Sequence, residues 1–226
     1  MKATDFEVRH QTLLHMLVVA LTFSTYAIAR DDIVWLIVRD SPHNRLLERC
    51  FFASAALLVG AGAAVCTWAR AYAEPNFSGP SDPLTCDGPY RYLRHPRYLG
   101  TLLFAVGLGA LAPIPGFVIL IAGDAFLVFR LIRRIDELER AACSSPDPPR
   151  APRLLSSLRP CFPSKGVLPN WKKAFRKESG RWALFFSMIV FAIVLIDRVA
   201  DVLVLASLLI GLLFNLPSFS RSQKHP

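Results

Sequence analysis

Apolar residues along the chain form four long blocks, separated by segments that are polar, charged or rich in proline. The blocks cover residues 12–29, 50–69, 98–132 and 182–216. The first two each have about the length of one membrane-spanning helix, which needs roughly 20 apolar residues. The other two are too long for a single span, so we expect two helices in each.

Helix-breaking or charged residues divide both long blocks. In the third block, Pro113 and Pro115 separate 99–112 from 116–132, because proline interrupts the interior of a helix. In the fourth block, three charged residues between 197 and 201 separate 183–196 from 202–216. The pattern therefore predicts an all-α fold: a polytopic membrane helix bundle of about six apolar helices, with a proline-broken helical hairpin.

The composition supports a membrane protein. Of the 226 residues, 53% are hydrophobic and 19% are charged, against roughly 25% charged residues in a soluble domain. Asp5 and Glu7 precede the first apolar block and no small-residue cleavage pattern follows it. We therefore expect a retained span there and not a secretory signal.

The distribution of basic residues predicts the orientation. Thirteen of the 26 Lys and Arg residues lie within 130–181, and cytoplasmic segments of membrane proteins carry such an excess. Segments 71–97 and 130–181 and both termini are expected in the cytoplasm, with 30–49 outside. The net charge of +9 then reflects this topology and attraction to anionic membrane lipid. Nucleic acid is not an expected partner, and the oligomeric state stays open.

The C-terminal part has two features. Trp171, Phe175 and Trp182 alternate with Lys and Arg over 170–182, which is typical of a helix in the lipid headgroup region. A solvated basic linker is the alternative. The apolar stretches 182–196 and 202–216 carry no ionisable residue, so we expect this hairpin to have a packing or partner-binding role.

The segment 88–100, GPYRYLRHPRYLG, has the highest density of aromatic and arginine residues in the chain. Pro96 predicts the first position of a helix, which places His95 near its N-cap. Arg94, His95 and the helix N-terminus together favour an anion. Tyr98 falls in the first turn, and Gly100 allows close approach of a neighbouring helix or a ligand.

A second polar cluster, RLIRRIDELER, covers 130–140. Arg130, Arg133, Arg134 and Glu137 are three or four residues apart and share one helix face. A positive anchor at the membrane surface is the simpler interpretation. The acidic residues among the arginines favour a functional role instead.

The five cysteines and the remaining polar residues suggest no metal or nucleophilic site. Cys50, Cys66, Cys86, Cys143 and Cys161 have no metal-ligand spacing, so free thiols are expected. No serine–histidine–aspartate triad, no glycine-rich nucleotide loop and no metal signature is apparent.

The two polar clusters resemble a known family. Segment 88–100 resembles the GPYRYxRHPxYxG signature of the isoprenylcysteine carboxyl methyltransferase family, and Arg134, Ile135 and Glu139 resemble its RIxxEE motif. Arg97 and Leu138 depart from these patterns, and Glu137 stands one place before an expected glutamate. The stretch after residue 140 departs further. The resemblance covers roughly residues 68–163.

The resemblance implies an integral-membrane methyltransferase that uses S-adenosylmethionine, with a cofactor site formed by both motifs at the cytoplasmic membrane face. The chain would then comprise two N-terminal transmembrane helices (1–70), a methyltransferase-like core (71–163) and a C-terminal part with an interfacial segment and a helical hairpin (164–226). The implied cofactor-binding residues are Tyr90, Arg94, His95, Tyr98, Gly100, Glu137 and Glu139.

The implied acceptor is a lipid-linked or apolar molecule, including a carboxylate, that Arg134 or Arg153 would orient. A carboxylate needs no general base, because the donor is already reactive and the protein mainly aligns the reactants. Two alternatives stay open: a phospholipid N-methyltransferase-like enzyme, and a degenerate, non-catalytic membrane-binding relative.

Overall fold

The computed structural model describes residues 4–29, 44–72, 87–142 and 168–194, together with residues 202, 206, 207, 209 and 210. Every regular element in these ranges is helical. The elements are α1 (Asp5–Arg9), α2 (Gln11–Ser24), η1 (Thr25–Ala27), α4 (Asn44–Tyr72), η2 (Gly88–Arg91), α5 (Pro96–Gly109), α6 (Ile114–Ala142), α7 (Trp171–Lys177) and α8 (Ser179–Val194).

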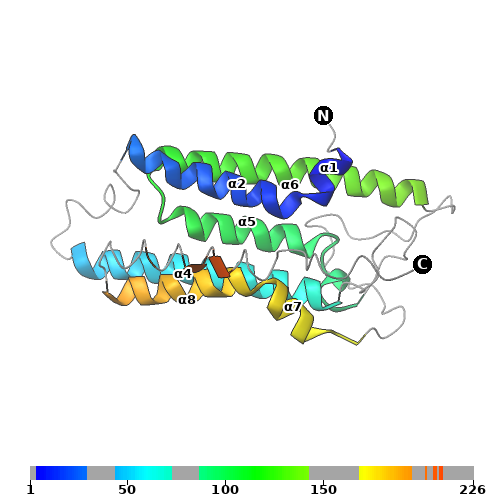
Figure 1. Cartoon of the computed structure of the whole chain (residues 1–226). Coiled ribbons are helices and arrows are strands. Elements are labelled where there is room, and N and C mark those ends of the chain that lie inside the picture. The colour runs from blue at the N-terminus through cyan, green and yellow to red at the C-terminus, as the bar shows by residue number, and fades with distance from the viewer. Residues whose placement is uncertain are drawn as a thin grey trace, which may run out of the picture.

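The long helices pack as a layered bundle with α5 in the middle. The pair α2 and α6 lies on one side of α5, and the pair α4 and α8 lies on the other (Figure 1). The largest apolar core fills the space between α4, α5 and α8, with Val59, Leu108 and Met188 among its fully buried side chains. Helices from all three expected segments of the chain therefore share one core.

Two of the described helices are long and apolar enough to cross a membrane, over Arg45–Tyr72 and Ile114–Glu137. The residues of α2 with η1, and those of α8, form shorter apolar helices. Five of the six expected apolar helices thus correspond to α2, α4, α5, α6 and α8. The sixth, 202–216, falls almost wholly outside the described residues, and six spans are not confirmed.

The predicted break in the third apolar block is confirmed. Helix α5 ends at Gly109, and α6 begins at Ile114 with Pro115 in its first turn, where a proline is tolerated. Helix α6 then continues without interruption to Ala142. The second polar cluster therefore prolongs a helix that starts in the apolar hairpin.

One end of the bundle collects the polar segments. This end of the bundle contains the last turn of α4, the beginning of α5, the last turns of α6, and the short helices η2 and α7 (Figure 1). This arrangement agrees with the expectation that 71–97 and 130–181 face the same side. Which side of a membrane this is remains a prediction.

Close contact between α4 and α5 depends on glycines. A Cβ atom on Gly62 would come within 2.6 Å of the Gly100 carbonyl oxygen and of the Phe104 nitrogen. A Cβ on Gly100 would come within 2.6 Å of Cys66 Sγ. These distances are too short for any side chain, so the two backbones approach each other only because both positions are glycine.

Candidate functional site

The first polar cluster, residues 88–100, forms the short 3-10 helix η2 and then the beginning of α5. Gly88 begins η2 with φ of 59°, a left-handed conformation that glycine adopts without steric cost. A side chain there would also collide with the Tyr72 ring, whose nearest atom would lie 2.5 Å from a Cβ. Gly88 therefore lets η2 pack against the end of α4 and directs the chain towards Pro96, the first residue of α5.

The two polar clusters meet at Asp136. Its Oδ1 atom lies 3.0 Å from His95 Nε2 and 3.1 Å from Arg94 Nη2. His95 is 9% exposed and precedes α5, whereas Asp136 is on α6. One carboxylate thus joins the beginning of α5 to the end of α6, 41 residues apart in sequence. We call these three residues the motif junction.

Tyr98 lies next to the motif junction. Its ring centroid is 6.0 Å from that of His95, and the side chain is 6% exposed. Val128 and Leu131 of α6 share its apolar cluster. Tyr98 also lines the cavity described below, so it lies between the motif junction and that cavity.

The other expected cofactor residues lie in different environments. Gly100 faces Cys66 and Gly62 of α4, so helix packing accounts for this glycine, and a cofactor contact remains a prediction. Tyr90 lies in η2 and is partly buried. Burial raises the pKa of its hydroxyl, although Arg97 and Arg70 act in the opposite direction.

The expected residues of the second cluster lie at the end of α6. Arg134 and Glu137 are partly buried there, Glu137 directly after Asp136. Glu139 is in the same helix, but its side chain is outside the described residues, and Arg153 is wholly outside them. The structure therefore brings Arg94, His95 and Tyr98 to the end of α6, while Glu139 and Arg153 remain predictions.

A cavity of about 120 Å³ lies between α2, α5, α6 and α8. Its lining comes from residues 11–19 of α2, from Tyr98, Thr101, Phe104 and Leu108 along one face of α5, and from residues 177–184. Ser207 and Asp124 complete it. We call it the central cavity. Among the expected cofactor residues whose side chains the structure describes, Tyr98 alone lines the central cavity.

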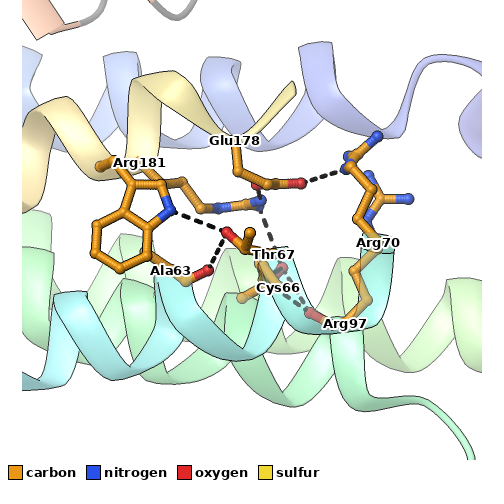
Figure 2. Close-up of polar contacts among 9 residues, drawn as sticks. Ala63, Cys66, Thr67, Arg70, Arg97, Glu178 and Arg181 are labelled. Carbon is orange, nitrogen blue, oxygen red and sulfur yellow. Dashed lines mark hydrogen bonds and ion pairs between the residues drawn. The ribbon is translucent and has the colours of Figure 1, made fainter. Parts of the chain in front are cut away.

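A buried carboxylate, Glu178, organises the polar end of the central cavity (Figure 2). Its side chain is 2% exposed and accepts a hydrogen bond from Arg70 Nε at 2.5 Å. Arg181 Nη1 donates to its other oxygen. Arg70 closes α4, whereas Glu178 and Arg181 belong to the junction of α7 and α8. This ion-pair cluster therefore fastens the C-terminal segment to α4.

Neighbouring polar contacts reinforce the cluster. Trp182 Nε1 donates to Thr67 Oγ1 at 2.9 Å, and the Thr67 hydroxyl donates to the Ala63 carbonyl at 2.7 Å (Figure 2). At the beginning of α7, the backbone N–H of Asn170 donates to the Ala71 carbonyl oxygen at 2.8 Å. Segment 170–182 thus packs along α4, and its residues 177–181 also line the central cavity. The sequence predicts a headgroup-region helix for this segment, and a packing role only for the hairpin 182–216.

Charge at the cluster changes the pKa of Glu178. Burial by itself raises the pKa of this carboxyl, but Arg181, Arg70 and Arg97 outweigh burial and hold it below the ordinary value of 4.5. Burial lowers the pKa of the Arg97 guanidinium, and the neighbouring Arg70 lowers it further. The polar end of the central cavity therefore contains more positive charge than Glu178 neutralises.

A second ionisable pair lies farther along the central cavity. His15 Nδ1 is 2.7 Å from Asp124 Oδ1, and Asp124 is 3% exposed. Asp124 lies within the apolar length of α6 that is long enough to cross a membrane. An ionisable residue at such a position is uncommon without a partner, and His15 of α2 supplies one.

These geometric findings can be compared with known proteins. Residues 49–143 match the model of the Isoprenylcysteine carboxyl methyltransferase (ICMT) family. We call residues 49–143 the ICMT-family segment, because they match this model. It contains the whole motif junction and most of α4, together with α5 and α6. No curated protein and no solved structure matches the chain.

The ICMT match confirms the resemblance read from the two motifs and supports a membrane methyltransferase in general. ICMT-family members use S-adenosylmethionine. The match begins inside α4 and ends at the end of α6, so α2, α7 and α8 lie outside it. Two walls of the central cavity therefore come from parts of the chain that the family segment does not include.

Sequence patterns alone do not assign several residues of the site. Asp136 is one of the acidic residues of the second polar cluster, but no motif assigns it to the site. Asp124 and His15 are isolated ionisable residues within apolar blocks, and that isolation was an available signal. No local pattern points to Glu178, because its partner Arg70 lies 108 residues earlier in the chain.

Proposed function

We propose that the chain is an integral-membrane methyltransferase that transfers a methyl group from S-adenosylmethionine to a lipid-linked or apolar acceptor, including a carboxylate. The motif junction carries this proposal. Arg94 and His95 on one side and Asp136 on the other come from the two motifs of the ICMT-family segment. Their contact supports one site built from both.

The chemistry of these residues fits the donor. S-adenosylmethionine has a carboxylate, an ammonium group, a sulfonium and an adenosine. Arg94 and the beginning of α5 suit the carboxylate, and Glu137 or Glu139 suits the ammonium group or the ribose hydroxyls. The Tyr98 ring beside His95 suits the sulfonium, because a cation over an aromatic ring gains about 0.5–2 kcal/mol. Tyr90 would add a second ring.

Tyr98 also suggests how donor and acceptor meet. It contacts the His95 side of the site and lines the central cavity, so an acceptor held in that cavity would approach the donor beside this ring. S-adenosylmethionine supplies an activated methyl group for an in-line displacement. The residues of the chain hold the two reactants in line and exclude water. Arg134 and Arg153 are the candidates for orienting an acceptor carboxylate.

A phospholipid N-methyltransferase-like activity is the second candidate within the same chemistry. The His15–Asp124 pair supports it, because a protonated amine must lose a proton before it attacks, and this pair offers an imidazole on the central cavity. A non-catalytic, ligand-binding relative is the third candidate, supported by the departure from the family pattern after residue 140.

The test is a calorimetric titration of the purified, full-length chain with S-adenosylmethionine. Saturable binding is expected, with a loss of roughly ten- to hundredfold in affinity for His95→Ala, because a charge-assisted contact contributes about 1.5–3 kcal/mol. His10→Ala is the matched control, since His10 stacks on Phe6 of α1 and does not line the central cavity.

Absence of binding to the unsubstituted chain at millimolar donor would refute the proposal. Binding without methylation of any carboxylate or amine acceptor would favour the non-catalytic candidate. Methylation of an amine but of no carboxylate would favour the phospholipid candidate.

A further inference from the structure

Asp136 holds the motif junction together with one of its two carboxylate oxygens. His95 Nε2 lies 3.0 Å from Oδ1, and Arg94 Nη2 lies 3.1 Å from the same atom. Within the residues that the structure describes, the other oxygen, Oδ2, makes no hydrogen bond. A carboxylate has about four acceptor positions, so Oδ2 still offers acceptor positions to another N–H or O–H group.

The free oxygen of Asp136 is also accessible. The Asp136 side chain is 22% exposed, and Oδ2 is not one of the enclosed polar atoms of the described residues. A ligand group can therefore reach Oδ2 without breaking the two contacts of Oδ1. Because the carboxylate is partly buried, a charged donor bound there would be screened less than in bulk water.

The position of Asp136 next to Arg94 matches the amino-acid part of the methyl donor. The ammonium and carboxylate groups of S-adenosylmethionine are bonded to one carbon atom, so the side chains that bind them must be neighbours. In the proposed function Arg94 binds the donor carboxylate, and Asp136 is in direct contact with Arg94. An acidic group at this distance from Arg94 is placed to receive the ammonium group.

The other carboxylates of the second polar cluster extend in different directions or from farther along α6. Glu137 follows Asp136 by one residue and is therefore turned about 100° around the helix. Glu139 is three residues after Asp136 and shares its face. Glu139 is thus the alternative that an experiment must separate from Asp136.

We propose that Asp136 Oδ2 binds the ammonium group of S-adenosylmethionine, beside Arg94 at the donor carboxylate, while Oδ1 keeps its contact with His95. This assignment rests on the proposed function and names a residue within its donor site. The charges of the donor then alternate with those of the chain, because each donor charge faces an opposite one. Glu137 and Glu139 are left for the ribose hydroxyls.

The experiment compares two ligands that differ by one group. S-adenosylhomocysteine, the product of methyl transfer, has both the carboxylate and the ammonium group, and its deamino analogue has the carboxylate alone. Calorimetry on the purified, full-length chain in detergent measures both affinities. The unsubstituted chain should bind the deamino analogue at least tenfold more weakly, because one charge-assisted contact is lost.

Asp136→Asn removes the charge but keeps an oxygen that can accept from His95. This variant should bind S-adenosylhomocysteine at least tenfold more weakly and the deamino analogue within about twofold of the unsubstituted chain. A merely structural role of Asp136 would weaken both ligands equally. Glu7→Gln is the matched control, since Glu7 also bonds an arginine of α6, Arg130, at 2.9 Å, and it should change neither affinity.

Two further variants locate each charge of the ligand. Arg94→Gln should weaken both ligands by the same factor, because both have the carboxylate. Glu139→Gln should leave the unsubstituted chain's preference for S-adenosylhomocysteine at tenfold or more. Thermal unfolding of each variant shows whether it is folded at the temperature of the titration.

Three results would overturn the assignment while leaving donor binding intact. Equal affinity of the unsubstituted chain for the two ligands would show that the ammonium group makes no charged contact. Equal weakening of both ligands in Asp136→Asn would reduce Asp136 to a residue that positions Arg94 and His95. Loss of the preference in Glu139→Gln but not in Asp136→Asn would assign the ammonium group to Glu139. Failure of the unsubstituted chain to bind S-adenosylmethionine at all would instead contradict the proposed function itself.

Discussion

At the scale of single residues, Glu178 is the buried carboxylate that pairs with Arg70 and Arg181 at the polar end of the central cavity. Three arginines act on it, and together they lower the pKa of its carboxyl below 4.5 although burial opposes them. A carboxyl whose pKa is lower in the folded state than in the unfolded state stabilises the fold above its unfolded pKa. That contribution is lost as the pH falls through the lower, folded-state value.

Glu178→Gln should therefore destabilise the protein by about 3 kcal/mol at pH 7, because removing one partner of a buried ion pair leaves the other uncompensated. The difference from the unsubstituted chain should shrink steadily below about pH 4.5. Denaturant unfolding in detergent at a series of pH values measures both effects. Arg176→Gln, an exposed change on α7, is the control, and a pH-independent difference would contradict the ion-pair explanation.

At the scale of elements, the contact between α4 and α5 depends on backbone atoms meeting across glycines. Gly62→Ala would place a methyl group 2.6 Å from backbone atoms of α5, which cannot move without displacing the helix. Gly60→Ala would meet only the Phe185 ring, also at 2.6 Å, and a side chain can rotate away.

We expect Gly62→Ala to lower the free energy of unfolding by about 1–3 kcal/mol. Gly60→Ala should be close to neutral, because alanine favours a helix over glycine by about 1 kcal/mol. Thermal unfolding of the two variants side by side makes the comparison. Equal destabilisation would mean that α4 and α5 are not held at this distance.

The short helix α7 has Asn170 as its N-cap residue. The Asn170 side chain accepts a hydrogen bond from the Lys173 amide at 3.0 Å, which satisfies a donor that a helix beginning otherwise leaves unpaired. Asn170→Ala should lower the free energy of unfolding by about 1 kcal/mol. Asn170→Ser should lose much less, since serine also caps helices. Failure of the serine variant to restore stability would assign the loss to another contact of Asn170.

At the scale of the whole molecule, the polar segments gather at one end of the bundle, and the predicted orientation puts that end in the cytoplasm. Cys50 is exposed near the beginning of α4, at the end opposite to α7 (Figure 1). In intact cells, Cys50 should react with a membrane-impermeant thiol reagent added outside. A cysteine introduced by Lys172→Cys, in a background where Cys50, Cys86, Cys143 and Cys161 are replaced by serine, should react only after permeabilisation. The reverse pattern would invert the topology.

The sequence predicted the elements of this fold better than the contacts between them. Apolar block lengths and Pro113 located α5 and α6, because hydrophobicity and chain breaks are local properties. The motifs likewise led to Arg94, His95 and Tyr98. The sequence predicts a headgroup-region helix for 170–182 and a packing role for the hairpin 182–216, yet Glu178 of the first and Leu184 of the second both line the central cavity. The pairing of two residues that are 108 apart in the chain depends on how the helices pack, and local sequence patterns do not reveal that packing.

The bond between Arg70 and Glu178 also has a consequence for how the protein is made. Ribosomes add about 5–20 residues per second, so the 108 residues that separate the two take roughly 5–20 s to synthesise. During that interval α4 has been made and its last-turn arginine still lacks the carboxylate that will neutralise it. Nascent chains therefore pass through a stage in which Glu178 does not yet neutralise Arg70, and we expect an anionic lipid head group to take that place. Depleting anionic lipid should harm biogenesis more than it harms the finished protein.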